Sequence, residues 1–356
     1  MTEIPGSNLP WGGDERTQAR YPRSQFWLHL RPARVLAANL RWTHTFGLGG
    51  SALVLLLALA ATGALQLLVY QPATGGAWQS VRALEHTVAF GSLVRGIHYW
   101  SANLLIVVMA LHLLRVLLTG AFREMRAVNW LIGLGLLLLV LAISFTGYLL
   151  PFDQRAWWAV TISTHMLDLI PGLGAGLRQL ALGADTIGDV TLVRFATFHT
   201  TVLPILLAGF AAWHFWRVRR AGGVIPASDD PGRVTFFPHL FVRELAQATL
   251  LLAFVIVLAS VFGAPLGDPA NPGLSPNPVK APWYFVGLQE LLIHVHPVLA
   301  LVVIPIGVLG LAIALPWLPS RRWPTRAMLV LIAAYVVLTV VGVWFRGENM
   351  ALVWPW

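Results

Sequence analysis

Seven long apolar runs constrain the fold of this chain more than any other feature of its sequence. About 20 consecutive apolar residues form a helix long enough to cross the ~30 Å hydrocarbon core of a bilayer. With 57% hydrophobic and 11% charged residues, the 356-residue chain has the composition of a membrane protein rather than of a soluble enzyme. We therefore predict an all-α integral membrane protein with about seven transmembrane helices, near residues 46–70, 99–119, 128–150, 196–218, 241–263, 297–316 and 327–345.

The basic residues indicate how these helices are oriented. The formal net charge is +9, and strong basicity can mark a nucleic-acid-binding protein. Here, however, most arginines fall in the N-terminal segment and in alternate loops, among them Arg123, Arg126, Arg321 and Arg322. The positive-inside rule assigns these segments to the cytoplasm. We expect a multi-pass protein of a bacterial inner membrane with a cytoplasmic N-terminus and no nucleic-acid partner.

Composition also suggests how the chain is divided. Residues 221–238 are rich in Gly, Pro and Asp and predict a linker. It separates a four-helix domain at 46–220 from a three-helix C-terminal domain at 239–356. Residues 1–45 form a polar, Arg-rich cytoplasmic segment, of which 25–41 predict an amphipathic helix on the membrane surface. The chain has no Cys, so an iron–sulfur cluster held by thiolates would have to belong to a partner.

Four histidines lie in the apolar helices as two matched pairs. His98 and His112 are about four helical turns and ~21 Å apart, and His199 and His214 are four turns plus ~60° and ~22 Å apart. Each pair thus occupies one helix face at two depths. If the helices are parallel, His98 meets His199 and His112 meets His214. A single intramembrane histidine is more often a packing residue, but two matched tiers favour bis-imidazole ligation of two haems.

Small and basic residues accompany the histidines. The first and third helices each carry two glycines at the interval of the histidines, which serve either helix packing or the close approach of flat macrocycles. Two arginines flank the histidine tiers, and each is either an interfacial anchor or a partner for a haem propionate. The glycines are Gly49, Gly63, Gly133 and Gly147, and the arginines are Arg95 and Arg115.

Several segments of the chain resemble the cytochrome b subunit of the quinol:cytochrome c (cytochrome bc and bf) complexes. They are RGIHYWSANLLIVVMALHLLRVLLTG, GYLLPFDQRAWWAVTI, FHTTVLP and AAWHFWRVRRAGG. The resemblance covers nearly the whole chain, in a form that fuses both halves of the protein. It implies a four-helix bundle that binds two haem b groups through His98/His199 and His112/His214, with the four glycines packed against them.

The activity that this resemblance implies is bifurcated quinol oxidation in a respiratory or photosynthetic complex. One electron passes to a Rieske-type iron–sulfur protein and on to a c-type or multihaem cytochrome. The other crosses the membrane by the two haems, and protons leave on the outer side. The resemblance also implies a homodimer.

The resemblance further implies an outer quinol pocket, built from residues 147–153 and the segment NPVKAPWYFVGLQELL. Trp283 and Tyr284 match a Trp-Tyr motif of the family, in which a preceding glutamate is thought to accept a proton. Pro282 replaces that glutamate here, and a proline cannot accept a proton. Glu290 is the nearest carboxylate, with His294 a weaker option, and it either takes over this role or is an ordinary interfacial glutamate.

Three further residues are candidates for quinone sites. Asp153 either contributes to a water or proton path at the outer pocket or is a solvated loop charge. Arg219 and Arg220, just after His214, either bind a quinone headgroup on the inner side or anchor the helix.

Two other kinds of protein use buried histidines. The membrane cytochrome b of a formate dehydrogenase or hydrogenase reduces quinone with electrons from a soluble partner, and in a non-redox transporter the histidines relay protons. The two histidine tiers, the matching glycine intervals and the WYF segment favour the quinol-oxidising function. A haem spectrum would exclude the transporter.

Overall fold

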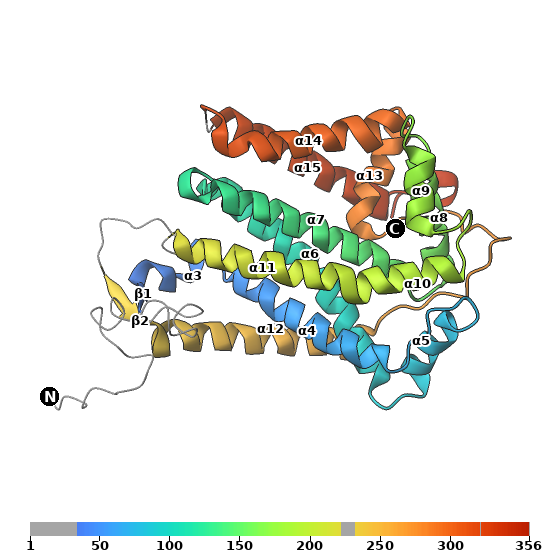
Figure 1. The fold of residues 1–356 in the computed structure, drawn as a ribbon, viewed down its shortest axis with the longest axis horizontal. Coiled ribbons are helices and arrows are strands. Elements are labelled where there is room, and N and C mark those ends of the chain that lie inside the picture. The colour runs from blue at the N-terminus through green and yellow to red at the C-terminus, as the bar shows by residue number, and fades with distance from the viewer. Residues whose placement is uncertain (1–33, 222–231, 321, 356) are drawn as a thin grey trace.

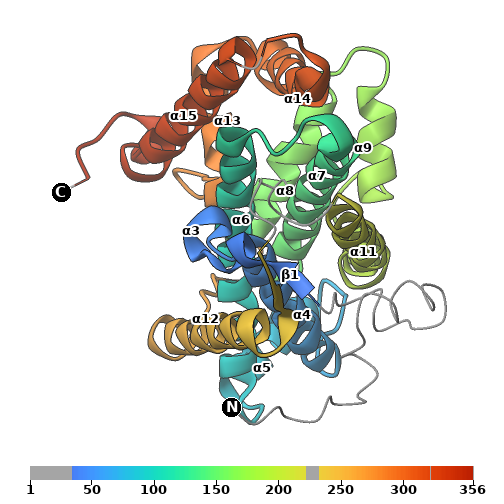
Figure 2. The same cartoon turned by 90° about the vertical axis from the view of Figure 1, so that its left-hand side faces the viewer.

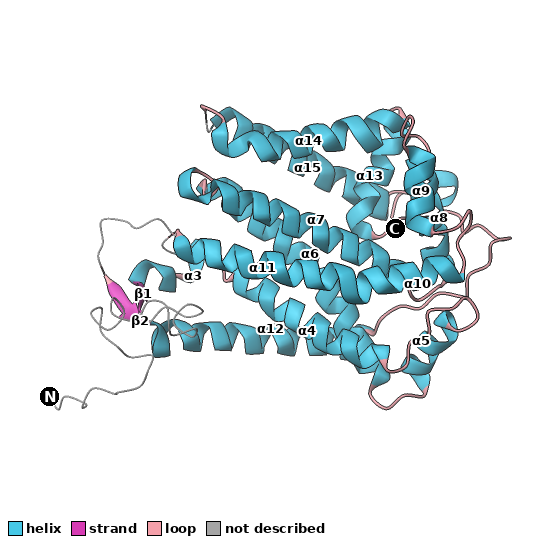
Figure 3. Ribbon diagram, in the orientation of Figure 1, coloured by secondary structure: helices cyan, strands magenta, loops and turns pink. Residues whose placement is uncertain are grey.

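The computed structural model describes residues 34–221, 232–320 and 322–355, and this part of the chain is mainly helical (Figures 1 and 3). The helices are α3 (Trp42–Thr45), α4 (Leu48–Leu67), α5 (Ala77–His86), α6 (Gly91–Thr119), α7 (Ala127–Leu149), α8 (Gln154–Leu167), α9 (Gly174–Leu182), α10 (Asp189–Thr197), α11 (Leu203–Arg220), α12 (Phe241–Phe262), α13 (Trp283–His294), α14 (Ile304–Ala314) and α15 (Arg322–Trp344). Turns of π-helix occur at Phe198–Val202, Phe236–Leu240 and Leu299–Val303. Turns of 3-10 helix occur at Ala37–Leu40, Glu124–Arg126, Leu315–Trp317 and Glu348–Met350.

Seven helical segments of the described residues are long and apolar enough to cross a membrane, which confirms the predicted number. Five of the seven spans are longer than hydropathy predicts, and the first and sixth are shorter. The second begins at Gly91 rather than near 99, because the polar Arg95 and His98 lower the hydropathy of its first turns. The fourth runs from Asp189 to Arg220, since α10, the π-turn Phe198–Val202 and α11 follow one another without a break.

The spanning helices run side by side along the long axis of the molecule, with α4 packed on α6 and α7 on α11 (Figure 1). Of the helices that follow the linker, α12 packs on α4 and α6, whereas α14 and α15 pack with α13 on the opposite side (Figure 2). Large aliphatic side chains face outward along these helices, for example Leu57, Leu250 and Val330, which are 62%, 72% and 66% exposed. Such a surface suits contact with lipid rather than with water.

The two ends of the molecule differ. The short helices α5, α8 and α9 lie at one end with α13, which we call the α13 end (Figure 1). At the other, the sheet end, strand β1 (Arg34–Leu36) pairs antiparallel with β2 (Arg233–Thr235) and joins the segments that precede α4 and α12. The strands are short and rich in β-branched residues, with Val35 opposite Val234.

The strands correct one prediction made from the sequence and add detail to a second. Residues 25–33 of the predicted surface helix lie outside the described residues, but Arg34–Leu36 form a strand where a helix was predicted. Residues 222–231 of the predicted linker also lie outside the described residues. Its last part is ordered as β2 and the π-turn Phe236–Leu240, because pairing with β1 satisfies the backbone of this polar segment.

Candidate functional site

The four intramembrane histidines come together in two pairs. The ring centroids of His98 and His199 lie 6.2 Å apart, and those of His112 and His214 lie 6.4 Å apart. An imidazole nitrogen lies about 2 Å from a transition metal, so two imidazoles on opposite sides of one metal place their centroids roughly 6 Å apart. Both pairs therefore fit bis-imidazole ligation of a haem iron. They are the pairs expected for parallel helices, while the ligand role itself stays a prediction.

A π-turn brings His199 and His214 onto one helix face. Their spacing exceeds four regular turns by ~60°. His199 lies in the π-turn Phe198–Val202, which takes up an extra residue before α11 begins. Single π-turns within α-helices are frequent at functional sites.

The histidine pair nearer the α13 end is oriented by hydrogen bonds from neighbouring helices. His199 Nδ1 lies 2.8 Å from the Ile143 carbonyl, which can only accept, so Nδ1 carries the proton. His98 Nδ1 lies 3.0 Å from Thr62 Oγ1, and that hydroxyl donates to the Ala58 carbonyl at 2.6 Å. In both rings Nε2 is left as the metal-binding nitrogen. Thr62 was not identified from the sequence, although a polar residue beside Gly63 in an apolar helix was a signal.

The four glycines each face one histidine. A Cβ atom added at Gly63 would lie 3.2 Å from Cε1 of His98, and one added at Gly147 would lie 2.4 Å from Cε1 of His199. At the other pair, a Cβ atom added at Gly49 would lie 3.9 Å from Cε1 of His112, and one added at Gly133 would lie 3.6 Å from Cε1 of His214. A side chain larger than glycine would therefore crowd the imidazoles of the His98/His199 pair, whereas at the other pair an added Cβ would make ordinary van der Waals contact.

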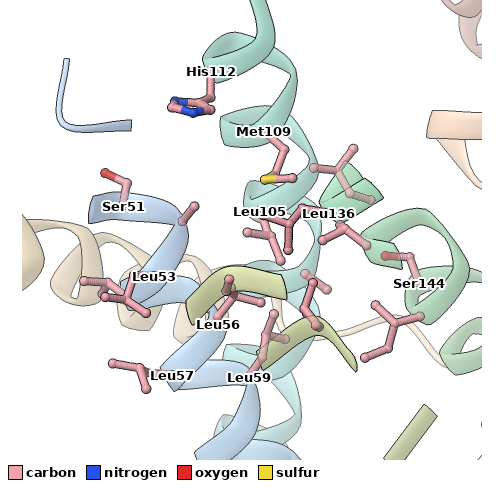
Figure 4. Close-up of a pocket in the computed structure, with 18 of the residues that line it drawn as sticks. Ser51, Leu53, Leu56, Leu57, Leu59, Leu105, Met109, His112, Leu136 and Ser144 are labelled. Carbon is pink, nitrogen blue, oxygen red and sulfur yellow. The ribbon is translucent and has the colours of Figure 1, made fainter. Parts of the chain in front are cut away.

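A single cavity of about 2370 Å³ joins both histidine pairs. Its volume is more than twice the ~1,000 Å³ upper range of small-molecule sites, so it has room for more than one large ligand. The middle of its wall is aliphatic. Figure 4 shows Leu105 and Met109 on α6 in the turns that precede His112, and Leu56 and Leu59 on α4. An apolar wall around paired imidazoles suits a haem.

Trp283 and Tyr284 line the cavity at the α13 end. The indole of Trp283 donates to Asn103 Oδ1 of α6 at 2.6 Å, which ties the start of α13 to a histidine-bearing helix. Burial raises the pKa of the Tyr284 phenol, so this side chain is a neutral hydroxyl at physiological pH. Both predicted residues thus lie in the cavity wall, while a quinol contact of either stays a prediction.

Asp153 also lines the cavity at this end, but its carboxylate is not a solvated loop charge. One oxygen accepts from the backbone N–H of Ala156 and caps α8, and the other accepts from the backbone N–H of Gly267, each at 2.9 Å. Asp153 thereby joins α8 to the proline-rich segment that precedes α13.

Glu290 does not line the cavity. It is 1% exposed, and its carboxylate forms a two-point ion pair with the guanidinium of Arg346, at 2.6 and 3.0 Å. His294 Nε2 lies 2.9 Å from the same carboxylate. The bonds from Arg346 hold the pKa of Glu290 below its usual value. A proton role for Glu290 is therefore disfavoured, since the residue is ionised, paired and outside the cavity.

The predicted arginines have different environments. Arg95 is buried, pairs with Glu85 and donates to the carbonyls of Ala264 and Pro265 at 2.8 and 2.6 Å, so it is no exposed interfacial anchor. Arg115 lines the cavity and donates from Nε to the His44 carbonyl at 2.9 Å. Propionate contacts of either stay predictions.

Arg219 and Arg220 are adjacent in sequence but lie in different surroundings. Arg219 lines the cavity at the sheet end. The guanidinium of Arg220 stacks on the Trp216 ring at 5.1 Å and does not line the cavity. A headgroup contact of Arg219 stays a prediction, whereas Arg220 is held against its own helix by this stacking.

The closest glycine contact yields a testable prediction. Gly147→Ala is expected to displace His199 and to reduce haem occupancy at the His98/His199 pair by more than half, because the new Cβ would overlap the ring. Gly209→Ala on α11 is the control, since no atom lies within 4 Å of its added Cβ. Haem absorbance per chain measures the haem occupancy of both variants. Equal occupancy in the two variants would show that the clearance at Gly147 is not needed.

Comparisons with known proteins agree with this geometry. A family model described as Cytochrome b/b6/petB matches residues 35–222, which include all four histidines and all four glycines. A solved structure described as "Hyperthermophilic respiratory Complex III" has the same fold, with a TM-score of 0.78 and 24% sequence identity, over 92% of this chain and 90% of that chain. The family match covers more than half of the sequence, and the fold match extends over most of the remainder. This chain is therefore a member of the cytochrome b family.

Proposed function

We propose that this protein is the two-haem cytochrome b subunit of a complex that oxidises quinol on the outer side of a bacterial inner membrane and moves electrons across it. The observation that carries the proposal is the placement of two histidine pairs, each with bis-imidazole spacing, along one cavity. When bound, the two haems would supply one-electron carriers at two depths. The fold match to a protein described as respiratory Complex III supports this function.

The residues of this chain would bind quinones at both ends of the cavity. We assign the α13 end to the outer side, where Trp283 and Tyr284 face the space that a quinol ring would fill. Asp153 fixes the segments around that space through its two backbone contacts. At the sheet end, Arg219 would bind the headgroup of the quinone that is reduced.

Oxidation of a quinol to a quinone releases two electrons and two protons. We propose that one electron crosses the membrane in this subunit, and that the other leaves through a partner. Because the chain has no Cys, a thiolate-bound cluster would belong to that partner, which we propose is a Rieske-type iron–sulfur protein serving a c-type or multihaem cytochrome. The protons would be released outside, and the complex would be a homodimer.

A haem assay with a redox titration tests the core of this proposal. The purified protein is expected to yield two b-type haems per chain in a pyridine haemochrome assay, with two separable midpoint potentials. Addition of a short-chain quinol to the complex is expected to reduce them. One haem or none would contradict the two-site scheme. Two haems that a quinol does not reduce would favour quinone reduction by electrons from a soluble partner.

A further inference from the structure

Lys280 is the single lysine of this chain, since every other basic side chain apart from histidine is arginine. The difference is chemical, because a guanidinium stays protonated in proteins, whereas an amine removed from water can lose its proton near neutral pH. Lys280 is therefore unlike the arginines of this chain in being able to exchange a proton with a ligand.

The fold places this lysine in the wall of the cavity at the α13 end. Its Nζ donates to the Val343 carbonyl of α15 at 2.8 Å, and the described residues offer it no ion pair. Gln289 on α13 fixes the backbone on both sides of it, since its side chain accepts from Ala281 N at 2.8 Å and donates to the Val279 carbonyl at 2.7 Å. Lys280 is thus held in the cavity wall three residues before Trp283, with its amine on the Val343 carbonyl of α15.

The carboxylates of the described residues do not fill the same role. Those that line the cavity are Asp153 and Glu244. Both oxygens of Asp153 accept backbone N–H groups, and Glu244 lies on α12 at the sheet end. Glu290 is outside the cavity and paired with Arg346. A proton leaving a quinol at the α13 end therefore has the amine of Lys280 as its best-placed acceptor.

We infer that Lys280 is the general base of quinol oxidation at this end of the cavity, an inference that rests on the proposed function. The neutral amine takes a proton from a quinol hydroxyl, so that the O–H bond breaks, an N–H bond forms and a quinolate remains. No electron moves in this step. The ammonium then stabilises the adjacent quinolate until its electrons leave for the acceptors of the proposed function, and it afterwards gives its proton to the outer solvent.

Burial lowers the pKa of Lys280, which increases the neutral fraction at physiological pH. Other charged or titratable groups also lie near Lys280. On α13 and after α15, Glu290 and His294 bind Arg346 or one another, as described above. The remaining groups on the segments around Lys280 include Tyr284 on α13, Tyr335 on α15, Glu348 after α15, Asp268 before Lys280, and the cavity-lining Tyr99, Tyr148, Asp153 and Arg155. The rate of quinol oxidation is therefore expected to rise with pH as Lys280 loses its proton.

Two variants of Lys280 distinguish a role as proton acceptor from a role as a positive charge. Lys280→Met keeps the length of the side chain without the amine, and Lys280→Arg keeps the positive charge without a group that deprotonates. Both are expected to retain two haems with unchanged potentials and to lower kcat of short-chain quinol oxidation about 100-fold, the contribution typical of a general base. Both are also expected to lose the rise of the rate with pH.

The control variant is Arg155→Met, which removes an exposed positive charge from the same end of the cavity. It is expected to change kcat less than twofold. Rescue of the rate by Lys280→Arg, or an equal loss in the Arg155 variant, would overturn the inference, because charge alone would then be sufficient. If the wild type oxidises quinol and the Lys280 variants do so equally well, the inference fails while the proposed function stands. If the wild type lacks two haems, the proposed function itself fails.

Chemical labelling provides a second readout that does not depend on a variant. Because Lys280 is the only lysine, an amine-reactive acylating agent has one side-chain target in the whole chain. A short-chain quinone is expected to slow its labelling, and labelled protein is expected to keep both haems and lose quinol oxidation. Labelling at the same rate with and without quinone, or full activity after labelling, would contradict a quinol contact.

Discussion

His112→Ala and His214→Ala are each expected to leave one haem per chain in place of two, and the remaining haem is expected to be the same in both variants. The rings of His112 and His214 face one another at 6.4 Å, so either substitution removes one of the two axial ligands of a single iron. The other pair lies about four helical turns away along the same cavity and keeps its own hydrogen bonds to Thr62 and Ile143. Haem absorbance per chain and a redox titration measure the result.

His98→Ala and His199→Ala complete this test, because they are expected to leave the complementary haem with the other midpoint potential. His165→Ala is the control. His165 is an exposed histidine of α8 that lies outside the cavity and binds the carbonyl one turn before it. The pairing is wrong if His112→Ala and His214→Ala leave different haems, and the ligand role is wrong if either retains both.

The features that could be predicted from the sequence are those that a single helix determines. Runs of apolar residues predicted seven spans, and the structure has seven among its described residues. The intervals between histidines predicted which rings meet, because rotation and rise per residue are the same in every regular helix. The π-turn at Phe198–Val202, in the second histidine-bearing segment, could be inferred only as a ~60° mismatch in the second interval.

The features that could not be predicted depend on contacts between distant segments. The sequence leaves Glu290 as either a replacement for the missing motif carboxylate or an interfacial glutamate, and it does not show that Arg346, far along the chain, pairs with it away from the cavity. Arg95 binds carbonyls of Ala264 and Pro265 in a loop that hydropathy cannot place. Lys280 is the single lysine of the chain, but its sequence position does not show that its segment lies in the cavity wall.

Glu290→Gln is expected to lower the stability of the protein by about 3 kcal/mol, because loss of one partner leaves the Arg346 charge buried without its counterion. Glu290 and Arg346 are 1% and 8% exposed. The pair joins α13 to the segment after α15, where Arg346 also donates to the Met350 carbonyl at 2.8 Å. The apparent unfolding midpoint of the protein in one fixed detergent measures the change, and Asp168→Asn, in the more exposed ion pair with Arg178, is expected to cost under about 1 kcal/mol.

The stability that Glu290 contributes is expected to fall on acidification. The pKa of Glu290 in the folded protein lies below its ordinary value, chiefly because Arg346 binds the ionised form. Its contribution is therefore complete above the ordinary glutamate pKa of about 4.3 and is lost as the pH falls through the lowered value. The stability of the wild type is expected to approach that of Glu290→Gln as the pH falls. Equal stability of the two proteins at neutral pH would show that the pair contributes nothing. Recovery of stability in a Glu290→Leu/Arg346→Met double variant would show that the unpaired charge of Arg346, rather than the lost contact, destabilises the single variant.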